Sequence, residues 1–150
     1  MVHYRLKYYQ MKNILLLICL MCPLFLFGQG MNITWEDSAG REFSINTHTR
    51  QFSWSMVAGD NITYNNAFSG GPDGSVKSIG YTSITYNNAL SGGPDGSVKS
   101  VGNVSITYNN AFSGEPDGTV KSVGGLRVNY NNAFSGGPDG SIKSTSGSVN

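Results

Sequence analysis

The chain has 150 residues, of which 39% are hydrophobic and 20 are glycine, and its formal net charge is +1 at pH 7. This composition, with few straight-chain helix formers, excludes a mainly helical protein and indicates a β-rich chain with many turns. From Met31 onward, seven Lys and Arg residues stand against nine Asp and Glu residues, a balance of −2, which excludes the basic surface that nucleic acid or anionic lipid requires.

Residues 1–30 have the pattern of a secretory signal peptide. The run from Ile14 to Phe27 is continuously apolar, follows Lys12 and is followed by small residues. About 14 apolar residues suit a signal peptide, whereas a bilayer span needs roughly 20. We therefore expect a secreted protein, extracellular, cell-surface or periplasmic, with no membrane span once the signal is removed. An uncleaved anchor is the alternative, and either Met1 or Met11 is the true start.

The two cysteines of the chain, Cys19 and Cys22, both lie inside this apolar run. Neither follows the small residue that a lipoprotein cleavage site prefers, although lipid attachment remains an alternative. If both leave with the signal peptide, the mature chain has no disulfide even though an export route would permit one. Its stability must then come from packing and hydrogen bonds.

Residues 31–61 are the least repetitive part of the mature chain and also indicate β structure. Phe43 and Ile45 alternate with polar residues, and Phe52, Trp54 and Met56 do the same after a polar segment, which predicts two strands and a turn. We expect this segment to be a divergent N-terminal cap on the repeats that follow, because the end of a repeat array leaves apolar groups unpaired. The alternative is that Trp35 and Trp54 form a platform for a ligand.

From Ile62 to Asn150, four near-copies of one 22-residue sequence follow each other without interruption. The copies are marked by tyrosines, turn aspartates and lysines at matching positions: Tyr64, Tyr86, Tyr108 and Tyr130; Asp73, Asp95, Asp117 and Asp139; Lys77, Lys99, Lys121 and Lys143. Self-similarity at a fixed period is the signature of a repeat architecture.

Each copy predicts two short strands joined by a tight turn. In the first strand, alternation places four side chains on one face, which we expect to be buried: Ile62, Tyr64, Asn66 and Phe68. In the turn, Pro72 suits the first central position of a type I turn, and Gly74 suits the positive φ that follows.

The second strand of each copy contains an irregularity. Val76 and Ile79 would face opposite sides of a regular strand. We therefore predict a β-bulge or bend near Ser78, which brings both apolar side chains to one face.

Two all-β architectures are compatible with this repeat. In an extended antiparallel meander of β-hairpins, equivalent residues are two strands apart, roughly 9.5 Å, whereas in a β-solenoid with one coil per repeat they stack at roughly 4.8 Å. Stacked Tyr and Asn columns suit the solenoid. Columns of Asp and Lys at the shorter spacing would repel one another, so we favour the meander.

The sequence offers little for catalysis, and we expect a protein that is not an enzyme and has no cofactor. Beyond residue 30 there is one histidine, His48, and no cysteine, so the usual metal and nucleophile arrangements are missing. Glu36, Asp37 and Glu42 are the only candidates for paired carboxylates of a hydrolase. Asp73 and its equivalents are candidates for calcium, although a Pro-Asp-Gly turn explains them without a metal.

What remains is a neutral surface on a secreted chain that repeats tyrosine and asparagine. Aromatic rings stack on sugars, amides hydrogen-bond to hydroxyls, and several weak sites add through avidity. We predict an extracellular interaction module, with polysaccharide or another copy of the chain as partner. The candidate binding residues are Tyr64, Tyr86, Tyr108, Tyr130, Asn65, Asn87, Asn109 and Asn131. Alternatively, the tyrosines form the core, and the array is a structural or self-assembling spacer.

Overall fold

The computed structural model describes residues 30–149, which form eleven antiparallel strands in two sheets. The all-β prediction is confirmed for this part of the chain. The predicted signal peptide lies outside the described residues apart from Gly30, as do both cysteines and the two candidate start residues.

The smaller sheet contains the three strands that precede the repeats: β1 (Asn32–Glu36), β2 (Glu42–Asn46) and β3 (Phe52–Trp54), in that order. Alternation places four apolar side chains of β1 and β2 on the buried face, namely Ile33, Trp35, Phe43 and Ile45. The Phe43 ring stacks between the rings of Trp35 and Phe52. The two strands predicted around Phe43 and Phe52 are confirmed, but β3 ends at Trp54, and Met56, which was predicted to continue the alternation, is exposed.

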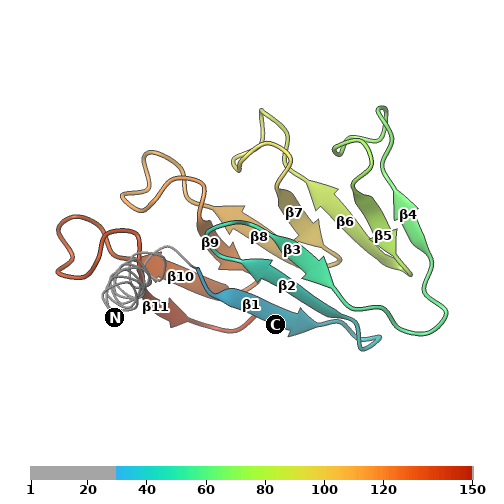
Figure 1. Ribbon diagram of the computed structural model, residues 1–150, viewed down its shortest axis with the longest axis horizontal. Coiled ribbons are helices and arrows are strands. Elements are labelled where there is room, and N and C mark those ends of the chain that lie inside the picture. Colours follow the sequence, from blue (N-terminus) through green and yellow to red (C-terminus); the bar gives the residue numbers. More distant parts are fainter. Residues whose placement is uncertain (1–29, 150) are drawn as a thin grey trace, which may run out of the picture.

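The larger sheet contains the eight strands of the four repeats, arranged as an antiparallel meander in chain order (Figure 1). Its strands are β4 (Ile62–Tyr64), β5 (Val76–Ile79), β6 (Thr82–Tyr86), β7 (Val98–Val101), β8 (Val104–Tyr108), β9 (Val120–Val123), β10 (Leu126–Tyr130) and β11 (Ile142–Ser146). Each repeat is one hairpin, so the meander prediction is confirmed and the solenoid alternative is wrong.

Each hairpin contains a β-bulge at its lysine. In the first repeat Thr63 pairs with Ser78 and Tyr64 pairs with Val76, which leaves Lys77 without a partner. The other three repeats have the same shift in register. The extra residue turns Val76 to the buried face, where Ile79 also lies, while Lys77 stays exposed. The irregularity predicted near Ser78 is therefore confirmed.

Consecutive hairpins are joined by two-residue turns that begin with glycine. Gly80 has a φ of 54°, which fits the first central position of a type II′ turn. Beyond this turn β5 and β6 pair at only two positions, Ser78 with Ser83 and Ile79 with Thr82. The backbone ladder between repeats is therefore short.

A tyrosine bridges neighbouring repeats where this ladder stops. The Tyr86 hydroxyl donates a hydrogen bond of 2.7 Å to the carbonyl of Val76 in the preceding repeat. Tyr108 donates to Val98 at 2.6 Å, and Tyr130 donates to Val120 at 2.7 Å. Each bond supplies a donor to a carbonyl near the bulge.

The smaller sheet lies across one face of the meander, which we call the inner face (Figure 1). Val120 donates its backbone N–H to the Thr47 carbonyl at 2.8 Å, and the Arg50 guanidinium donates to the Gly118 carbonyl at 3.1 Å. The segment expected to cap the array thus covers a face of the repeats and does not pair with β4. This position buries the apolar side of β1 and β2 against the apolar side of the hairpins.

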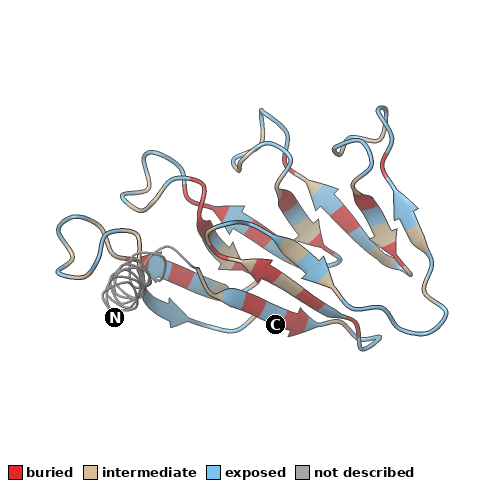
Figure 2. Ribbon diagram, in the orientation of Figure 1, coloured by how far each residue is buried: buried red, intermediate tan, exposed pale blue. Residues whose placement is uncertain are grey.

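Burial of the repeat tyrosines increases along the chain, because Tyr64 has no preceding repeat and residues that follow β2 pack on Tyr130. Tyr64 is 59% exposed, Tyr86 is half-buried, and Tyr108 and Tyr130 are 5% and 3% exposed. Figure 2 shows buried residues in the strands of both sheets and exposed residues around the ends of the long loops.

We predict that Tyr108→Phe lowers the free energy of unfolding by about 1–3 kcal/mol, because it leaves the buried Val98 carbonyl without a donor. The matched control is Tyr64→Phe, since Tyr64 has no preceding repeat, and it should change stability by less than about 0.5 kcal/mol. Denaturant unfolding of dilute protein measures both, and equal losses would contradict the bridging role.

Candidate functional site: a row of loop tips

The four hairpins end in long loops of one conformation, at residues 65–75, 87–97, 109–119 and 131–141. At the base of the first loop, the Asn65 N–H donates to the Ser75 carbonyl at 2.8 Å, and the Gly74 N–H donates to the Asn65 carbonyl at 2.9 Å. The same pair of bonds recurs in each of the other loops. The loop bases are therefore closed by backbone hydrogen bonds.

An asparagine fixes the outer half of each loop. Asn66 Oδ1 accepts hydrogen bonds from the Phe68 N–H at 3.0 Å and from the Ser69 hydroxyl at 2.8 Å. The Ser69 N–H donates to the Asn66 carbonyl at 2.9 Å, and the Asn66 N–H donates to the Ser69 hydroxyl at 3.0 Å. These four bonds hold Ala67 and Phe68 at the tip of a closed turn.

The Pro-Asp-Gly part of the loop forms the predicted turn, but the turn is shifted by one residue. The Ser75 N–H donates to the Pro72 carbonyl at 3.0 Å, so the turn begins at Pro72, whereas we expected Pro72 at its first central position. The shift arises because the Gly74 N–H bonds across the loop to Asn65 and does not close a turn from Gly71. Gly74 has a φ of 74°, as predicted for this glycine.

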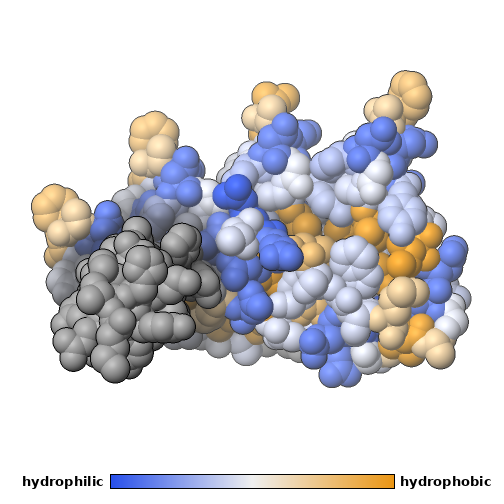
Figure 3. All heavy atoms as spheres, viewed as in Figure 1, coloured by the Kyte–Doolittle hydropathy of each residue, from blue (hydrophilic) through white to orange (hydrophobic). Residues whose placement is uncertain are grey.

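Each loop presents one large apolar side chain at its tip. These four residues, which we call the tip row, are Phe68, Leu90, Phe112 and Phe134, and each is 97% exposed. The four loops lie in a row at the same end of the strands, and their tips project from the surface (Figures 1 and 3). Neighbouring tips belong to hairpins two strands apart, so their attachment points are roughly 9.5 Å apart.

The tip row corrects the prediction that Phe68 is buried on the face of Tyr64. Strand β4 ends at Tyr64, and the Asn66 turn then changes the direction of the chain, so strand alternation does not extend to residue 68. A sequence signal was present: the apolar residue follows an Asn-Asn-Ala sequence and precedes Ser-Gly in every copy. Asparagine followed by serine and glycine is typical of a turn.

The loops around the tip row are acidic. They contain five carboxylates and no Lys or Arg, the carboxylates being those of Asp73, Asp95, Glu115, Asp117 and Asp139. The lysine of each repeat lies instead in the bulge of the second strand. The tip row is thus a row of apolar side chains on acidic loops.

Three of the four tyrosines predicted to bind a ligand lie between the repeats, where they bridge neighbouring hairpins. Burial raises the pKa of the Tyr108 hydroxyl to about 12, and it raises the pKa of the Tyr130 hydroxyl to about 12 as well. Both hydroxyls are therefore neutral hydrogen-bond donors at physiological pH. Tyr64, in the first repeat, is the most exposed of the series.

The four predicted asparagines lie at the bases of the loops. Asn65, Asn87 and Asn109 are buried and Asn131 is half-buried. Each side-chain amide donates to the hydroxyl that closes the same loop, for example Asn65 to Ser75 at 2.9 Å and Asn109 to Thr119 at 3.0 Å. In this structure the asparagines support the loops that present the tip row.

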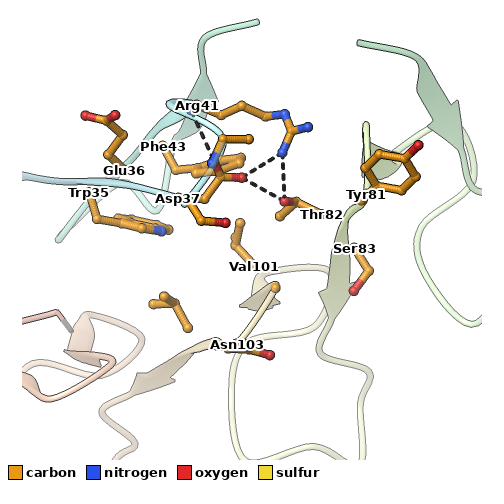
Figure 4. A pocket seen from close by; sticks show the side chains of 14 residues that line it. Trp35, Glu36, Asp37, Arg41, Phe43, Tyr81, Thr82, Ser83, Val101 and Asn103 are labelled. Carbon is orange, nitrogen blue, oxygen red and sulfur yellow. Dashed lines mark hydrogen bonds and ion pairs between the residues drawn. The ribbon is translucent and has the colours of Figure 1, made fainter. Parts of the chain in front are cut away.

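A second candidate site is an open cleft of about 810 Å³ between the β1–β2 turn and the turns that follow β5 and β7 (Figure 4). Arg41 lies in its wall, 5% exposed, and its guanidinium is 2.8 Å from the Asp37 carboxylate and 2.9 Å from the Asp60 carboxylate. The Thr82 hydroxyl donates to Asp37 at 2.8 Å. This network fastens the β1–β2 turn to the segment that precedes β4 and to the start of β6.

The carboxylates considered for a hydrolase do not form a pair of free acids in this cleft. Burial opposes ionisation of Asp37, but hydrogen bonds from Thr82 and Arg41 outweigh it and lower the pKa of that carboxyl to about 2. Asp37 is therefore an ionised partner of Arg41. Glu36 lines the cleft, whereas Glu42 is exposed and does not.

The two tryptophans considered as a ligand platform lie at the inner face. Trp35 is 6% exposed and Trp54 is half-buried against Phe52. Within residues 30–149 there is no group of three or more His, Cys, Asp and Glu side chains that could hold a metal ion.

The same part of the chain contains no helix that is long and apolar enough to span a bilayer. Comparisons with protein-family models, with curated proteins and with solved structures give no match to this chain.

We predict that the contribution of Asp37 to the stability of the fold depends on pH. Its pKa is lowered in the folded state, so ionised Asp37 stabilises the fold above about pH 4, and this contribution is lost as the pH falls towards 2. Asp37→Asn should therefore lower the melting temperature at pH 7, and its difference from the unmodified chain should shrink at pH 2. Glu36→Gln is the control, and a constant difference for Asp37→Asn across this range would contradict the prediction.

Proposed function

We propose that the protein is a non-enzymatic extracellular interaction module that binds an extended partner through the tip row. The observation that supports this proposal is that one hydrogen-bonded loop, with a fully exposed apolar residue at its tip, is repeated at the same end of each hairpin. Monomeric soluble proteins seldom expose large apolar side chains in a regular array without a binding role.

The arrangement favours a repetitive or flat partner over a small molecule. Each tip is a single side chain with no surrounding pocket, so one tip alone binds weakly. Four tips in a line can contact the same extended surface together, and linked weak contacts raise the overall affinity by about 10²–10⁴. The hydrogen bonds inside each loop reduce the ordering cost of binding.

We propose a polysaccharide without net charge as the partner. Phenylalanine rings at three of the four tips suit stacking on the C–H faces of sugar rings. The five loop carboxylates disfavour anionic lipid, anionic polysaccharide and nucleic acid at this edge. The tip row thus replaces the tyrosine columns as the proposed contact residues, and the tyrosines and asparagines support it.

A structural or self-assembling spacer is the second candidate. It is supported by the burial of Tyr108 and Tyr130, which makes these side chains part of the core. This role alone does not explain why every copy exposes an apolar tip.

Replacing the phenylalanine tips by serine one after another should weaken binding to an uncharged polysaccharide by about tenfold for each residue, because burying a phenylalanine contributes about 1.5–3 kcal/mol. Tyr81→Ser is the matched control, since Tyr81 is equally exposed but lies at a turn on the opposite edge. Affinity electrophoresis or pull-down on an insoluble polysaccharide, with dilute protein, measures the effect.

Leu90 provides a sharper test of the ligand class. If rings stack on sugars, Leu90→Phe should strengthen binding and Phe112→Leu should weaken it, whereas plain apolar contact would make the two residues equivalent. Binding of the same variants to neutral lipid vesicles is measured in parallel. Binding to vesicles alone, or polysaccharide binding that survives the loss of all four tips, would contradict the proposal.

A further inference from the structure

The contact between consecutive repeats has two parts, a hydrogen bond and a close packing of a ring on a glycine. The Tyr86 hydroxyl donates to the Val76 carbonyl. A Cβ atom at Gly71 would lie only 3.0 Å from the Tyr86 ring, and one at Gly93 would lie 2.8 Å from the Tyr108 ring. The first and second repeats therefore each offer a carbonyl and a glycine to the tyrosine of the next, whereas the third offers the Val120 carbonyl and has Glu115 in place of the glycine.

The two ends of the meander carry the unused halves of this contact. At the β4 edge, Tyr64 has no preceding repeat and is 59% exposed. At the β11 edge, Gly137 and Ile142 occupy the positions of Gly71 and Val76, and no tyrosine ring lies against Gly137. In the described sheet, the outer strand β4 thus carries a tyrosine that lacks its receiving site, and the outer strand β11 belongs to a receiving site that lacks its tyrosine.

We propose that copies of this chain associate head to tail, with β4 of one copy pairing with β11 of the next. In this contact Tyr64 donates its hydroxyl to the Ile142 carbonyl of the neighbouring copy and packs its ring on Gly137. The interface repeats the hydrogen bond made three times within each chain and the packing of a ring on a glycine made twice. Because its two surfaces differ, it is heterologous and leaves a free surface at each end, so it leads to open-ended assemblies and not to closed dimers.

The C-terminal residues leave the β11 edge available. In the earlier repeats the chain turns at Gly80, Gly102 and Gly124 into the next strand of the sheet. Residues 147–149 instead continue alongside the start of β10, so that Val149 lies against Gly124 and Gly147 lies against Gly125. The segment therefore lies beside the previous turn, while β11 remains an outer strand.

One residue makes this edge weaker than the internal contacts. Thr145 occupies the position of Ile79, Val101 and Val123, and it is exposed, whereas those three are at most 2% exposed. A polar residue here weakens the contact between copies, so we expect the association to be reversible. The same difference makes Thr145 a site where the affinity can be changed in both directions.

Sedimentation velocity over a range of concentrations tests the proposal, with the purified chain at full length and beginning at Gly30. We expect a mass that grows continuously with concentration. Thr145→Ile should strengthen association, and Thr145→Lys should weaken it, about tenfold or more in each case. Tyr64→Phe should weaken it several-fold, because it removes the bridging hydroxyl and keeps the ring. Circular dichroism checks that each variant is folded.

Phe68→Ser separates this inference from the proposed function, because loss of one tip should weaken polysaccharide binding and leave association unchanged. The inference is overturned if the unmodified chain and Thr145→Ile both stay monomeric at every concentration. It is also overturned if a discrete dimer forms that responds neither to Thr145→Lys nor to Tyr64→Phe.

Discussion

Lys77 has no partner across its hairpin, because Thr63 pairs with Ser78 and Tyr64 pairs with Val76. This one extra residue in every repeat places Val76 and Ile79 on the same face, which gives the meander an apolar side for the smaller sheet to cover. It also lies where the ladder between repeats stops, so that the tyrosine of the next repeat takes up the Val76 carbonyl. Sheet packing and repeat stacking both depend on this bulge.

Rigid strands and rigid loops together explain how the tip row is presented. The repeats are fixed against each other by the tyrosine bonds and by the smaller sheet, and each loop is closed on itself by hydrogen bonds of its asparagines and serines. The apolar tips consequently stand in a regular line with no large ordering cost to be met on binding. If copies add head to tail, the same geometry extends the line, and avidity increases with the length of the assembly.

Much of the fold could be predicted from the sequence, because its signals are local and occur four times. The period of 22 residues indicated the hairpins, the mismatch of Val76 and Ile79 indicated the bulge, and repulsion within Lys and Asp columns favoured the meander. The site was predicted less well. Phe68 resembles a core residue in an alternating pattern, and this pattern outweighed the turn signal of the asparagines before it and the Ser-Gly after it; the hydrogen bonds of Asn66 show that the strand has already ended. The position of residues 31–61 over the inner face also had no local signal, since it depends on contacts such as that between Thr47 and Val120.

In this structure the tips face solvent, while the repeat tyrosines hold the hairpins together. Paramagnetic relaxation by a soluble probe, read from the aromatic ring protons in NMR spectra of dilute protein, tests it most directly. We predict strong relaxation for Phe68, Phe112 and Phe134, and protection for Phe43, Tyr108 and Tyr130. Protected tip rings together with exposed Tyr108 and Tyr130 rings would contradict this arrangement and would favour the repeat tyrosines as the binding surface.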